Sequence, residues 1–462
     1  MNKLLKWIAG IAFFGLICCG LNYLLVRDDP WYRILFHSYE QQKKIDNLFI
    51  GSSHVYCDVN PDILDELSGK QNFNLATPGQ RWDDSYYLVR DAVSRFDIEH
   101  LYLECYSWNL TEYETWIKDE KTYRVVDYID DPENYPYAWQ ITDAMKPGVN
   151  TAAMLFHSAD ADHMLESMFP FTRFRTSIFD KESLHNNIEE KQSENYREYI
   201  YQEEMAKADG TSWYIEYREK GYFYSNGCLL DSEKLFRQVR DFNKNGIGEK
   251  SGEYLRKILD FCRGKGIAVT LFVAPVYELQ LLSTENYDKF HLELKELSAE
   301  YDVPLYDFNL IKNEFLDLHD SSLYMDCGHL NGRGAEQFTS VLWEVMNTSE
   351  NENIEKFYRS YGEKISNAEP QIYGLYFTDL YPNGDYYADG TPVHLTRRYK
   401  IAFSTPEMEC RVYRSTPEGI TEISVRMENG EGIFELPVGE LGTAIITGEY
   451  PGGECSLSVE LK

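Results

Sequence analysis

Residues 46–54 of the chain read Asp-Asn-Leu-Phe-Ile-Gly-Ser-Ser-His. The first six of these residues are a short apolar run that ends in glycine, a pattern typical of a buried strand that leads into a tight turn. Ser53 follows at the start of a predicted helix, where backbone N–H groups converge and can stabilise a negative charge. A serine can also stand there only to cap the helix. The stretch therefore predicts an α/β unit with a candidate nucleophile after its first strand.

The chain beyond this stretch repeats the alternation of strand and helix. We expect further strands at residues 71–78, 101–106, 267–274 and 304–308, and helices at residues 83–95, 254–262, 290–301 and 334–346. This alternation predicts an α/β fold with a parallel sheet and helices on both of its faces. In such sheets the functional side chains collect beyond the carboxyl ends of the strands.

A second group of polar residues precedes the last of these helices, where residues 326–334 read Asp-Cys-Gly-His-Leu-Asn-Gly-Arg-Gly. Asp326 and His329 are close enough on this loop for the carboxylate to hold one ring nitrogen while the other accepts a proton from a serine. The alternative is a loop that merely caps the helix through Asn331. Ser53 does not stand in a G-x-S-x-G elbow, because Val55 is two positions later, and this weighs against an α/β-hydrolase.

These motifs resemble those of the SGNH (GDSL-like) hydrolase family. They are FIGSSH after the first strand, a glycine-containing block at residues 74–79, and DCGHLNGRGA at residues 326–335. The resemblance covers about residues 44–346 and is nearest to the membrane-anchored members that act in D-alanyl transfer and alginate O-acetylation. It implies a three-layer, flavodoxin-like SGNH domain with a parallel sheet.

By position, the resemblance implies Ser53 as the nucleophile, Asp326 as the acid and His329 as the base. The backbone N–H groups of Ser53 and Gly79 would belong to the oxyanion hole. The family also has an asparagine after its third strand. Asn109 is the nearest match, but its context, CYSWN, does not reproduce the family's G-x-N-D pattern.

His54 adjoins the candidate nucleophile and could contact substrate, or it could pack inside the protein or cap the turn. Together with Asp326 and His329 it would also suit a zinc ion. A zinc site would leave Ser53 unexplained, so we expect neither a metal nor another cofactor.

The N-terminus carries a candidate membrane helix. Lys3 and Lys6 precede an apolar run at residues 7–26, which at 1.5 Å per residue spans roughly 30 Å, the thickness of a bilayer core. No small-residue cleavage site follows, so we expect a retained signal anchor. The basic N-terminus would stay inside and the body would be extracytoplasmic, at the cell surface. The alternative is a buried helix of a soluble domain.

We divide the chain into four parts, which are a signal anchor at 1–29, an SGNH-like α/β domain at 30–346, a linker at 347–370 and a β-sandwich at 371–462. A segment from about 109 to 250 interrupts the α/β domain and is predicted to be a helical cap over the site. The sandwich is predicted from short alternating runs punctuated by Gly, Pro and Asn. Cys410 and Cys455 could form a disulfide there or be free thiols.

Composition and resemblance together define the expected function. The formal net charge of −31 repels phosphate backbones, which argues against nucleic acid as a partner. We expect an extracytoplasmic serine esterase or O-acyltransferase that acts on cell-envelope or extracellular glycans through an acyl-serine intermediate. Its partners would be an acylated or acyl-accepting glycan and a membrane-bound acyltransferase. The alternative is a catalytically inactive SGNH-like protein that binds a surface or docks a partner.

Overall fold

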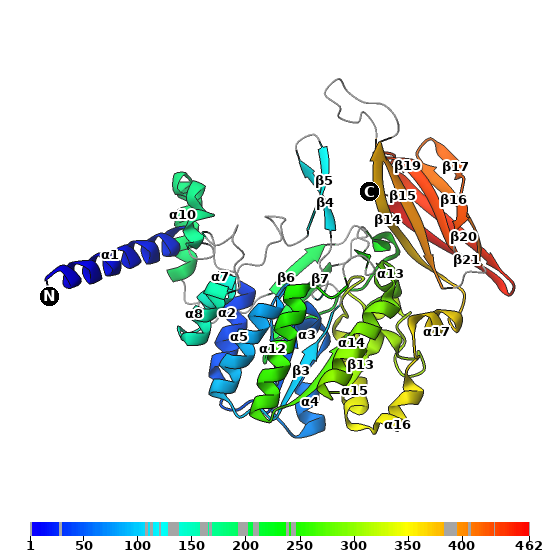
Figure 1. Ribbon diagram of the computed structural model, residues 1–462. Coiled ribbons are helices and arrows are strands. Elements are labelled where there is room, and N and C mark those ends of the chain that lie inside the picture. Colours follow the sequence, from blue (N-terminus) through cyan, green and yellow to red (C-terminus); the bar gives the residue numbers. More distant parts are fainter. Residues whose placement is uncertain are drawn as a thin grey trace.

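The chain has three visible parts. Helix α1 (Asn2–Leu25) projects from one side, an α/β unit lies in the middle, and a β-sandwich lies on the side away from α1 (Figure 1). The computed structural model describes residues 2–26, 30–106, 110, 114–119, 122–127, 138–157, 165, 169–192, 202–206, 212–236, 240–241, 246–382, 395–404, 408–428 and 430–461.

A parallel five-stranded sheet forms the centre of the α/β unit. In chain order its strands are β1 (Asn47–Gly51), β2 (Asn72–Ala76), β3 (His100–Glu104), β11 (Ala268–Val273) and β13 (Leu305–Asp307). They lie side by side in the order β13-β11-β3-β1-β2, and every neighbouring pair is parallel. The predicted parallel sheet is confirmed, and its strand order reverses between β1 and β3, as in doubly wound folds.

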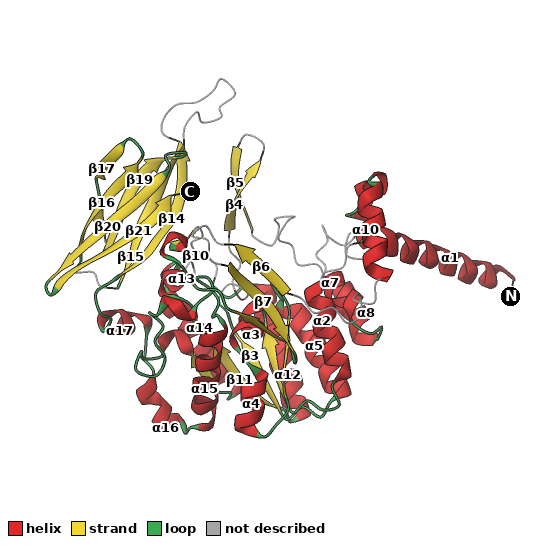
Figure 2. Cartoon of the chain, turned by 180° about the vertical axis from the view of Figure 1, so that it is seen from behind, coloured by secondary structure: helices red, strands yellow, loops and turns green. Residues whose placement is uncertain are grey.

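Helices cover both faces of this sheet, and the two layers can be followed in Figures 1 and 2. One face packs against α2 (Pro30–Gln41), α5 (Trp82–Arg95), α12 (Glu249–Lys265) and α14 (Tyr287–Tyr301). The other face packs against α3 (Ser53–Asp58), α4 (Pro61–Ser68) and α15 (Gly332–Asn347). Shorter elements fill the connections, namely α13 (Glu278–Leu282), β12 (Thr284–Glu285), η7 (Phe308–Leu310) and η8 (Ser321–Leu323). The four predicted helices are confirmed.

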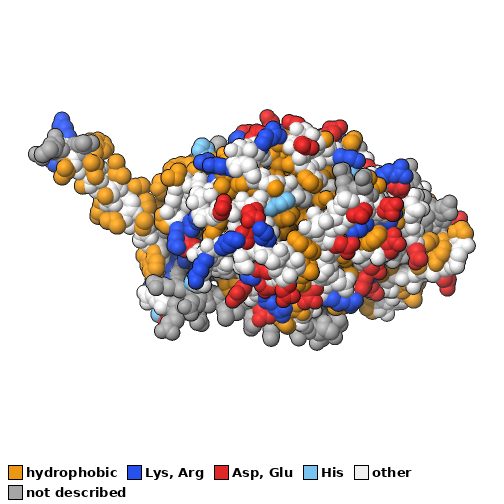
Figure 3. All heavy atoms as spheres, turned by 90° about the horizontal axis from the view of Figure 1, so that it is seen from below, with side chains coloured by type: hydrophobic (Ala, Val, Ile, Leu, Met, Phe, Trp, Pro, Cys, Tyr) orange, Lys and Arg blue, Asp and Glu red, His pale blue; other side chains and the backbone are white. Residues whose placement is uncertain are grey.

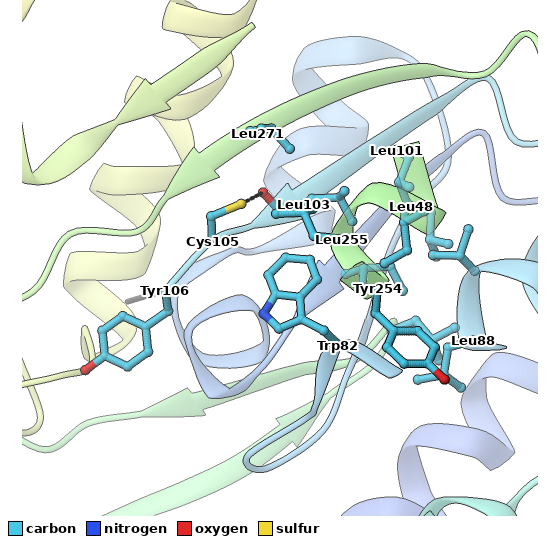
Figure 4. Packing of buried hydrophobic residues seen from close by; sticks show 14 of the residues in the cluster. Leu48, Trp82, Leu88, Leu101, Leu103, Cys105, Tyr106, Tyr254, Leu255 and Leu271 are labelled. Carbon is cyan, nitrogen blue, oxygen red and sulfur yellow. Dashed lines mark hydrogen bonds between the residues drawn. The ribbon is translucent and has the colours of Figure 1, made fainter. Parts of the chain in front are cut away.

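Alternating side chains of the central strands build two separate cores. In β1, Leu48 belongs to the first core and Phe49 to the second. A strand buried on both faces reads as a continuous apolar run, which explains why its sequence lacks a polar alternation. In Figure 4, Trp82 packs among leucines of the first core, while Tyr106, just beyond β3, points away from them. The Tyr106 ring instead lies 3.8 Å from the ring of His54.

The insertion between β3 and α12 mixes helices and strands. Its described elements are β4 (Glu114–Asp119), β5 (Thr122–Asp127), α7 (Ala138–Ala144), α8 (Val149–His157), η3 (Pro170–Thr172), η4 (Arg175–Phe179), α10 (Lys181–Gln192), β6 (Gln202–Ala206), β7 (Ser212–Arg218), β8 (Tyr222–Ser225), η6 (Asp231–Glu233), β9 (Leu235–Phe236) and β10 (Arg240–Asp241). The predicted helical cap has the helices α7, α8 and α10, but the prediction is wrong in leaving out the strands. The β7 sequence, SWYIEYR, is rich in aromatic residues, which favour strands.

The turn between β7 and β8 fixes the insertion to the edge of the sheet. The carbonyl of Lys220 accepts a hydrogen bond of 2.9 Å from the backbone N–H of Asn74 in the edge strand β2. Lys220 Nζ lies 2.6 Å from Asp62 and 2.7 Å from Asp65, both on α4. Gly221 adopts a positive φ of 80° and approaches the Asn74 carbonyl so closely that a Cβ would overlap it. The turn thereby shields an edge that would otherwise offer unpaired backbone groups.

Residues 347–370, expected to be a linker, form α16 (Glu350–Asn353), η9 (Ile354–Lys356) and α17 (Tyr361–Ser366) and pack against the α/β unit. Lys364 Nζ lies 3.2 Å from Glu278 Oε2, and the two side chains are 2% and 1% exposed. Tyr361 donates a hydrogen bond of 2.9 Å to the same carboxylate. Separating these groups would leave a buried charge unpaired, so the segment is bound to the α/β unit.

The C-terminal unit consists of two sheets that are antiparallel apart from one short strand. Their orders are β18-β19-β15-β14-β9 and β17-β16-β20-β21. The strands are β14 (Ile372–Pro382), β15 (Leu395–Phe403), β16 (Glu409–Thr416), β17 (Gly419–Ile423), β18 (Arg426–Glu428), β19 (Glu431–Pro437), β20 (Gly442–Tyr450) and β21 (Gly453–Leu461). Strand β9 pairs in parallel with β14, so the insertion contributes a strand to this unit.

Cys410 and Cys455 are free thiols. Both pair with Gly448 of β20, but from opposite sides, because Cys410 lies on β16 and Cys455 on β21. Two strand spacings separate them, which is about 10 Å. A disulfide needs Cα atoms within about 7 Å, so the geometry excludes this pairing.

Helix α1 contains the apolar stretch Leu5–Leu25, which has 21 residues and is only 6% buried against the rest of the protein. It is long and apolar enough to cross a membrane or to act as a signal anchor. In Figure 3 it appears as a rod of mostly hydrophobic side chains that projects from the body.

Candidate active site

Ser53 is the first residue of α3 and lies directly beyond the carboxyl end of β1. Gly51 makes this close connection possible, because a Cβ there would lie 2.5 Å from Cγ2 of Val55 and 2.8 Å from Cβ of Glu104. The serine thus stands beside the point between β1 and β3 where the strand order reverses. Doubly wound sheets bind their ligands at this point.

The structure brings Ser53, His329 and Asp326 together. His329 Nε2 lies 2.7 Å from Ser53 Oγ, and His329 Nδ1 lies 3.0 Å from each carboxylate oxygen of Asp326. Asp326 Oδ1 also accepts hydrogen bonds from the backbone N–H groups of Gly328 and His329, which fixes the loop. This is the arrangement in which a histidine can take a proton from a serine while a carboxylate holds its tautomer.

The helix cap expected at Asn331 is present as well. Its Oδ1 accepts a hydrogen bond of 3.0 Å from the backbone N–H of Gly334 in the first turn of α15. Its Nδ2 donates to the carbonyl of Gly227 at 2.8 Å, so the same side chain ties the insertion to the loop that carries His329. A Cβ on Gly332 would overlap the ring of Tyr224, which shows how closely β8 packs on this loop.

A buried pair behind the catalytic candidates links α3 to the histidine loop. Asp58 Oδ1 accepts a hydrogen bond of 2.9 Å from the backbone N–H of Leu330, the neighbour of His329. Asp58 Oδ2 lies 3.2 Å from His54 Nδ1. The His54 ring stacks on the His329 ring, with centroids 4.7 Å apart and planes inclined by 22°. Asp58 therefore joins the helix that carries Ser53 to the loop that carries its partner.

His54 is 1% exposed. This burial argues against the predicted substrate contact, because the side chain turns inward to Asp58 and supports the ring of His329. Burial, and next the charge of His329, lower the pKa of His54 well below its usual value, so its imidazole is neutral. Burial raises the pKa of Asp58 well above its usual value.

Glu104 is a second buried carboxyl group near the site, at the carboxyl end of β3. Burial raises its pKa to about 8, although backbone N–H groups of Ala274 and Tyr106 donate to it and lower the value. Its Oε2 has no hydrogen-bond partner among the described residues. Glu104 is thus mostly protonated at neutral pH and becomes charged as the pH rises past its pKa.

The charges around His329 strengthen its affinity for a proton. Burial lowers its pKa, but the carboxylate of Asp326 and its hydrogen bond, followed by Asp58 and Glu104, outweigh burial and raise the pKa to about 9. For Asp326, burial raises the pKa, whereas the charge of His329 and the hydrogen bonds to its carboxylate lower it to about 2. The desolvation of Asp326 is only partial, because 55% of its side chain is exposed, and water therefore screens its charge.

Two of the three predicted oxyanion donors can be located. Ser53 N–H lies in the first turn of α3, where backbone N–H groups point out of the helix. Gly79 lies in the turn after β2, the neighbour of β1, with a positive φ of 58°. Within the described part of the chain, neither N–H donates a hydrogen bond. Asn109, the third predicted donor, lies outside the described residues.

Sequence reasoning missed the buried supporting residues Asp58, Glu104, Tyr106 and Gln280. Tyr106 and Gln280 share a hydrogen bond beside the His54 ring. Two signals were available in the sequence. His54 and Asp58 are four residues apart on a helix, so they face the same side, and Glu104 is the one charged residue in the apolar run LYLECY.

Among the described residues, no group of three or more His, Cys, Asp or Glu side chains is arranged to hold a metal ion. A scan against protein-family models and a search of curated proteins both found no match to this sequence.

Proposed function

We propose that the protein is an SGNH-type serine esterase or O-acyltransferase with Ser53 as nucleophile, His329 as general base and Asp326 as the residue that orients the histidine. The single observation that supports this most strongly is the 2.7 Å separation of His329 Nε2 and Ser53 Oγ, with Nδ1 held by Asp326. In the noncatalytic alternative, nothing would require these three side chains to meet at the carboxyl edge of the sheet.

The reaction follows from this geometry. His329 Nε2 removes the hydroxyl proton as Ser53 Oγ attacks an ester carbonyl, and the resulting oxyanion is held by the N–H groups of Ser53 and Gly79. Collapse of the intermediate breaks the bond to the leaving alcohol, which takes the proton from His329. Water or a sugar hydroxyl then attacks the acyl-serine, again with His329 as base. Each oxyanion donor is expected to contribute on the order of 10²–10³ in rate.

We further propose that the body lies outside the cytoplasm, held to the membrane by α1, and acts on acyl groups of envelope or extracellular glycans. Support comes from the apolar length of α1 and from the resemblance of the motifs to membrane-anchored acyl-transfer proteins. A membrane-bound acyltransferase would then supply the acyl group where the protein works as a transferase.

The proposal is tested by measuring whether the full-length protein in detergent turns over an activated acetyl ester and an acetylated polysaccharide. We expect hydrolysis of at least one of them, with a loss of roughly 10⁴-fold or more in kcat for Ser53→Ala and for His329→Ala. Ser52→Ala is the matched control, because Ser52 is the adjacent serine and is buried. Equal turnover by the native protein and Ser53→Ala would rule the mechanism out.

A further inference from the structure

Residues 169–179, which contain η3 and η4, run beside helix α1. The backbone N–H of Phe171 donates a hydrogen bond of 3.1 Å to Asn22 Oδ1 of α1. The ring of Phe169 meets that of Phe14 edge to face, with centroids 6.0 Å apart. We call residues 169–179 the anchor segment.

The contact with Phe14 lies deep along the apolar stretch of α1. Phe14 precedes Leu25, the last residue of the helix, by 11 positions, which corresponds to roughly 16 Å along the axis. A bilayer core is about 30 Å thick. If Leu5–Leu25 crosses a membrane, the anchor segment must therefore reach into the same leaflet, because its ring contact lies about halfway across.

The side chains of the anchor segment suit this environment. Phe179 is 90% exposed, more than any other large hydrophobic side chain of the described residues, and Ile178 is 50% exposed. Isolated exposed hydrophobics are common on soluble surfaces, but these two belong to η4, which contacts the membrane-length helix α1. Water would leave both side chains hydrated, whereas lipid would bury them.

The charges of the segment complement a lipid surface. Its charged residues are Arg173 and Arg175, in a chain whose formal net charge is −31. Lys191 of α10 donates hydrogen bonds to the carbonyls of Tyr23 and Val26, where α1 ends. Figure 3 shows Lys and Arg side chains on the body near the base of α1. Aromatic and aliphatic side chains flanked by arginines are typical of segments that lie in the headgroup region.

We propose that the anchor segment is a second membrane contact, which inserts Phe179 and Ile178 into the leaflet that α1 enters and places Arg173 and Arg175 among the lipid headgroups. Hydrogen bonds from Asn187 of α10 to the carbonyls of Leu24 and Val26 fix the base of α1. With α1 and the anchor segment both in contact with the membrane, the body cannot rotate about α1 as its single attachment. The orientation of the active site relative to the membrane is then set by the fold.

The test replaces Phe179 by the photoreactive residue p-benzoylphenylalanine in the full-length protein, reconstituted in vesicles of phosphatidylcholine and phosphatidylglycerol. The matched control carries it at Ile420 of β17, which is 68% exposed on the sandwich. After irradiation, mass spectrometry should find phospholipid attached at position 179 and none at position 420. A chain that lacks lipid at 179, or that is cross-linked there to a second copy of itself, would overturn the proposal. Ile178 offers a second site for the same replacement.

Discussion

At the scale of single residues, His329 is surrounded by carboxyl groups in two layers. Asp326 touches its Nδ1 directly, whereas Asp58 and Glu104 are buried behind it. Burial lowers the pKa of His329, but Asp326, which also orients the ring, raises it most, and Asp58 and Glu104 raise it further. A base with so high a pKa is protonated at neutral pH, so the proposed reaction needs conditions or a substrate that favour the neutral imidazole.

The first prediction concerns pH. Activity requires neutral His329, whose fraction grows as the pH rises through its pKa of about 9. The specificity constant kcat/KM for an acetyl ester should therefore increase up to about pH 9. It should not level off near the ordinary histidine pKa of about 6.5. Glu104→Gln removes one of the charges that raise this pKa, so it should shift the midpoint to lower pH. The exposed residue Glu99 provides the control, Glu99→Gln, and a midpoint unaffected by Glu104→Gln would show that Glu104 does not raise the pKa of His329.

The second prediction concerns Asp58, a positioning residue that does not touch the reacting atoms. Asp58→Asn keeps the shape of the side chain but weakens its hold on His54 and on the backbone of Leu330. Because small misplacements of a catalytic group are costly, we expect a fall in kcat on the order of 10²-fold. KM and the melting temperature should change little. Asp97→Asn, at an exposed position, is the control, and a variant with native kcat would show that Asp58 does not position the base.

At the scale of elements, the segment from α16 to α17 connects the α/β unit to the sandwich through packed contacts. Its polar sequence resembles that of a flexible linker, which is why it was expected to be one. Contacts of single side chains hold this segment in place. The main one is made by Lys364, whose Nζ lies beside the Glu278 carboxylate and donates a hydrogen bond to the carbonyl of Asn309. Amino-acid composition does not reveal such pairs. The packing of this segment on the α/β unit therefore depends on the buried Glu278 carboxylate, which needs the Lys364 ammonium group as its partner.

The third prediction follows from this ion pair. Lys364→Met leaves the Glu278 carboxylate buried without its cation and should lower the free energy of unfolding by about 3–5 kcal/mol. Thermal denaturation of the full-length protein in detergent measures the change. Arg359→Ala, whose side chain is 89% exposed, should leave the transition almost unchanged. Equal transitions for both variants would show that the segment is not held by this pair.

The sequence predicts some elements far better than others. Strands β1, β3 and β11 were predictable because strands buried on both faces leave nearly continuous apolar runs. The structure of the insertion was not predictable, because aromatic residues of β7 and β8 serve both strand pairing and packing on other elements. Phe223 of β8, for example, contacts Trp31 of α2 and Tyr56 of α3. Strand β9 has two residues and is defined only by its bonds to β14, far along the chain. Likewise, the spacing of Asp326 and His329 indicated their chemistry. The spacing of His54 and Asp58 places them on the same side of a helix, but it does not indicate whether that side is buried.

At the scale of the whole molecule, the parts are linked more closely than a chain of separate domains. Strand β9 joins the insertion to the sandwich, Asn331 joins the insertion to the active-site loop, and α10 joins it to the base of α1. The insertion thus contacts each of the other parts. Helix α1 and the candidate active site are thereby held in one framework.

The fourth prediction concerns topology. With α1 as a retained anchor and its basic N-terminus inside, the C-terminal sandwich lies outside the cell. An epitope placed after Lys462 should be detected by antibody on intact cells, whereas one placed before Met1 should need permeabilised cells. The opposite pattern would place the body in the cytoplasm and remove envelope glycans as substrates.

The role of Ser53 as nucleophile is tested by covalent labelling of the full-length protein with a fluorophosphonate probe, followed by mass spectrometry of the modified peptide. We expect one modified residue, Ser53, with labelling abolished in Ser53→Ala, strongly slowed in His329→Ala and retained in Ser52→Ala. A native protein that is as inert as Ser53→Ala, or that is modified at another serine, would contradict the assignment of Ser53 as the nucleophile.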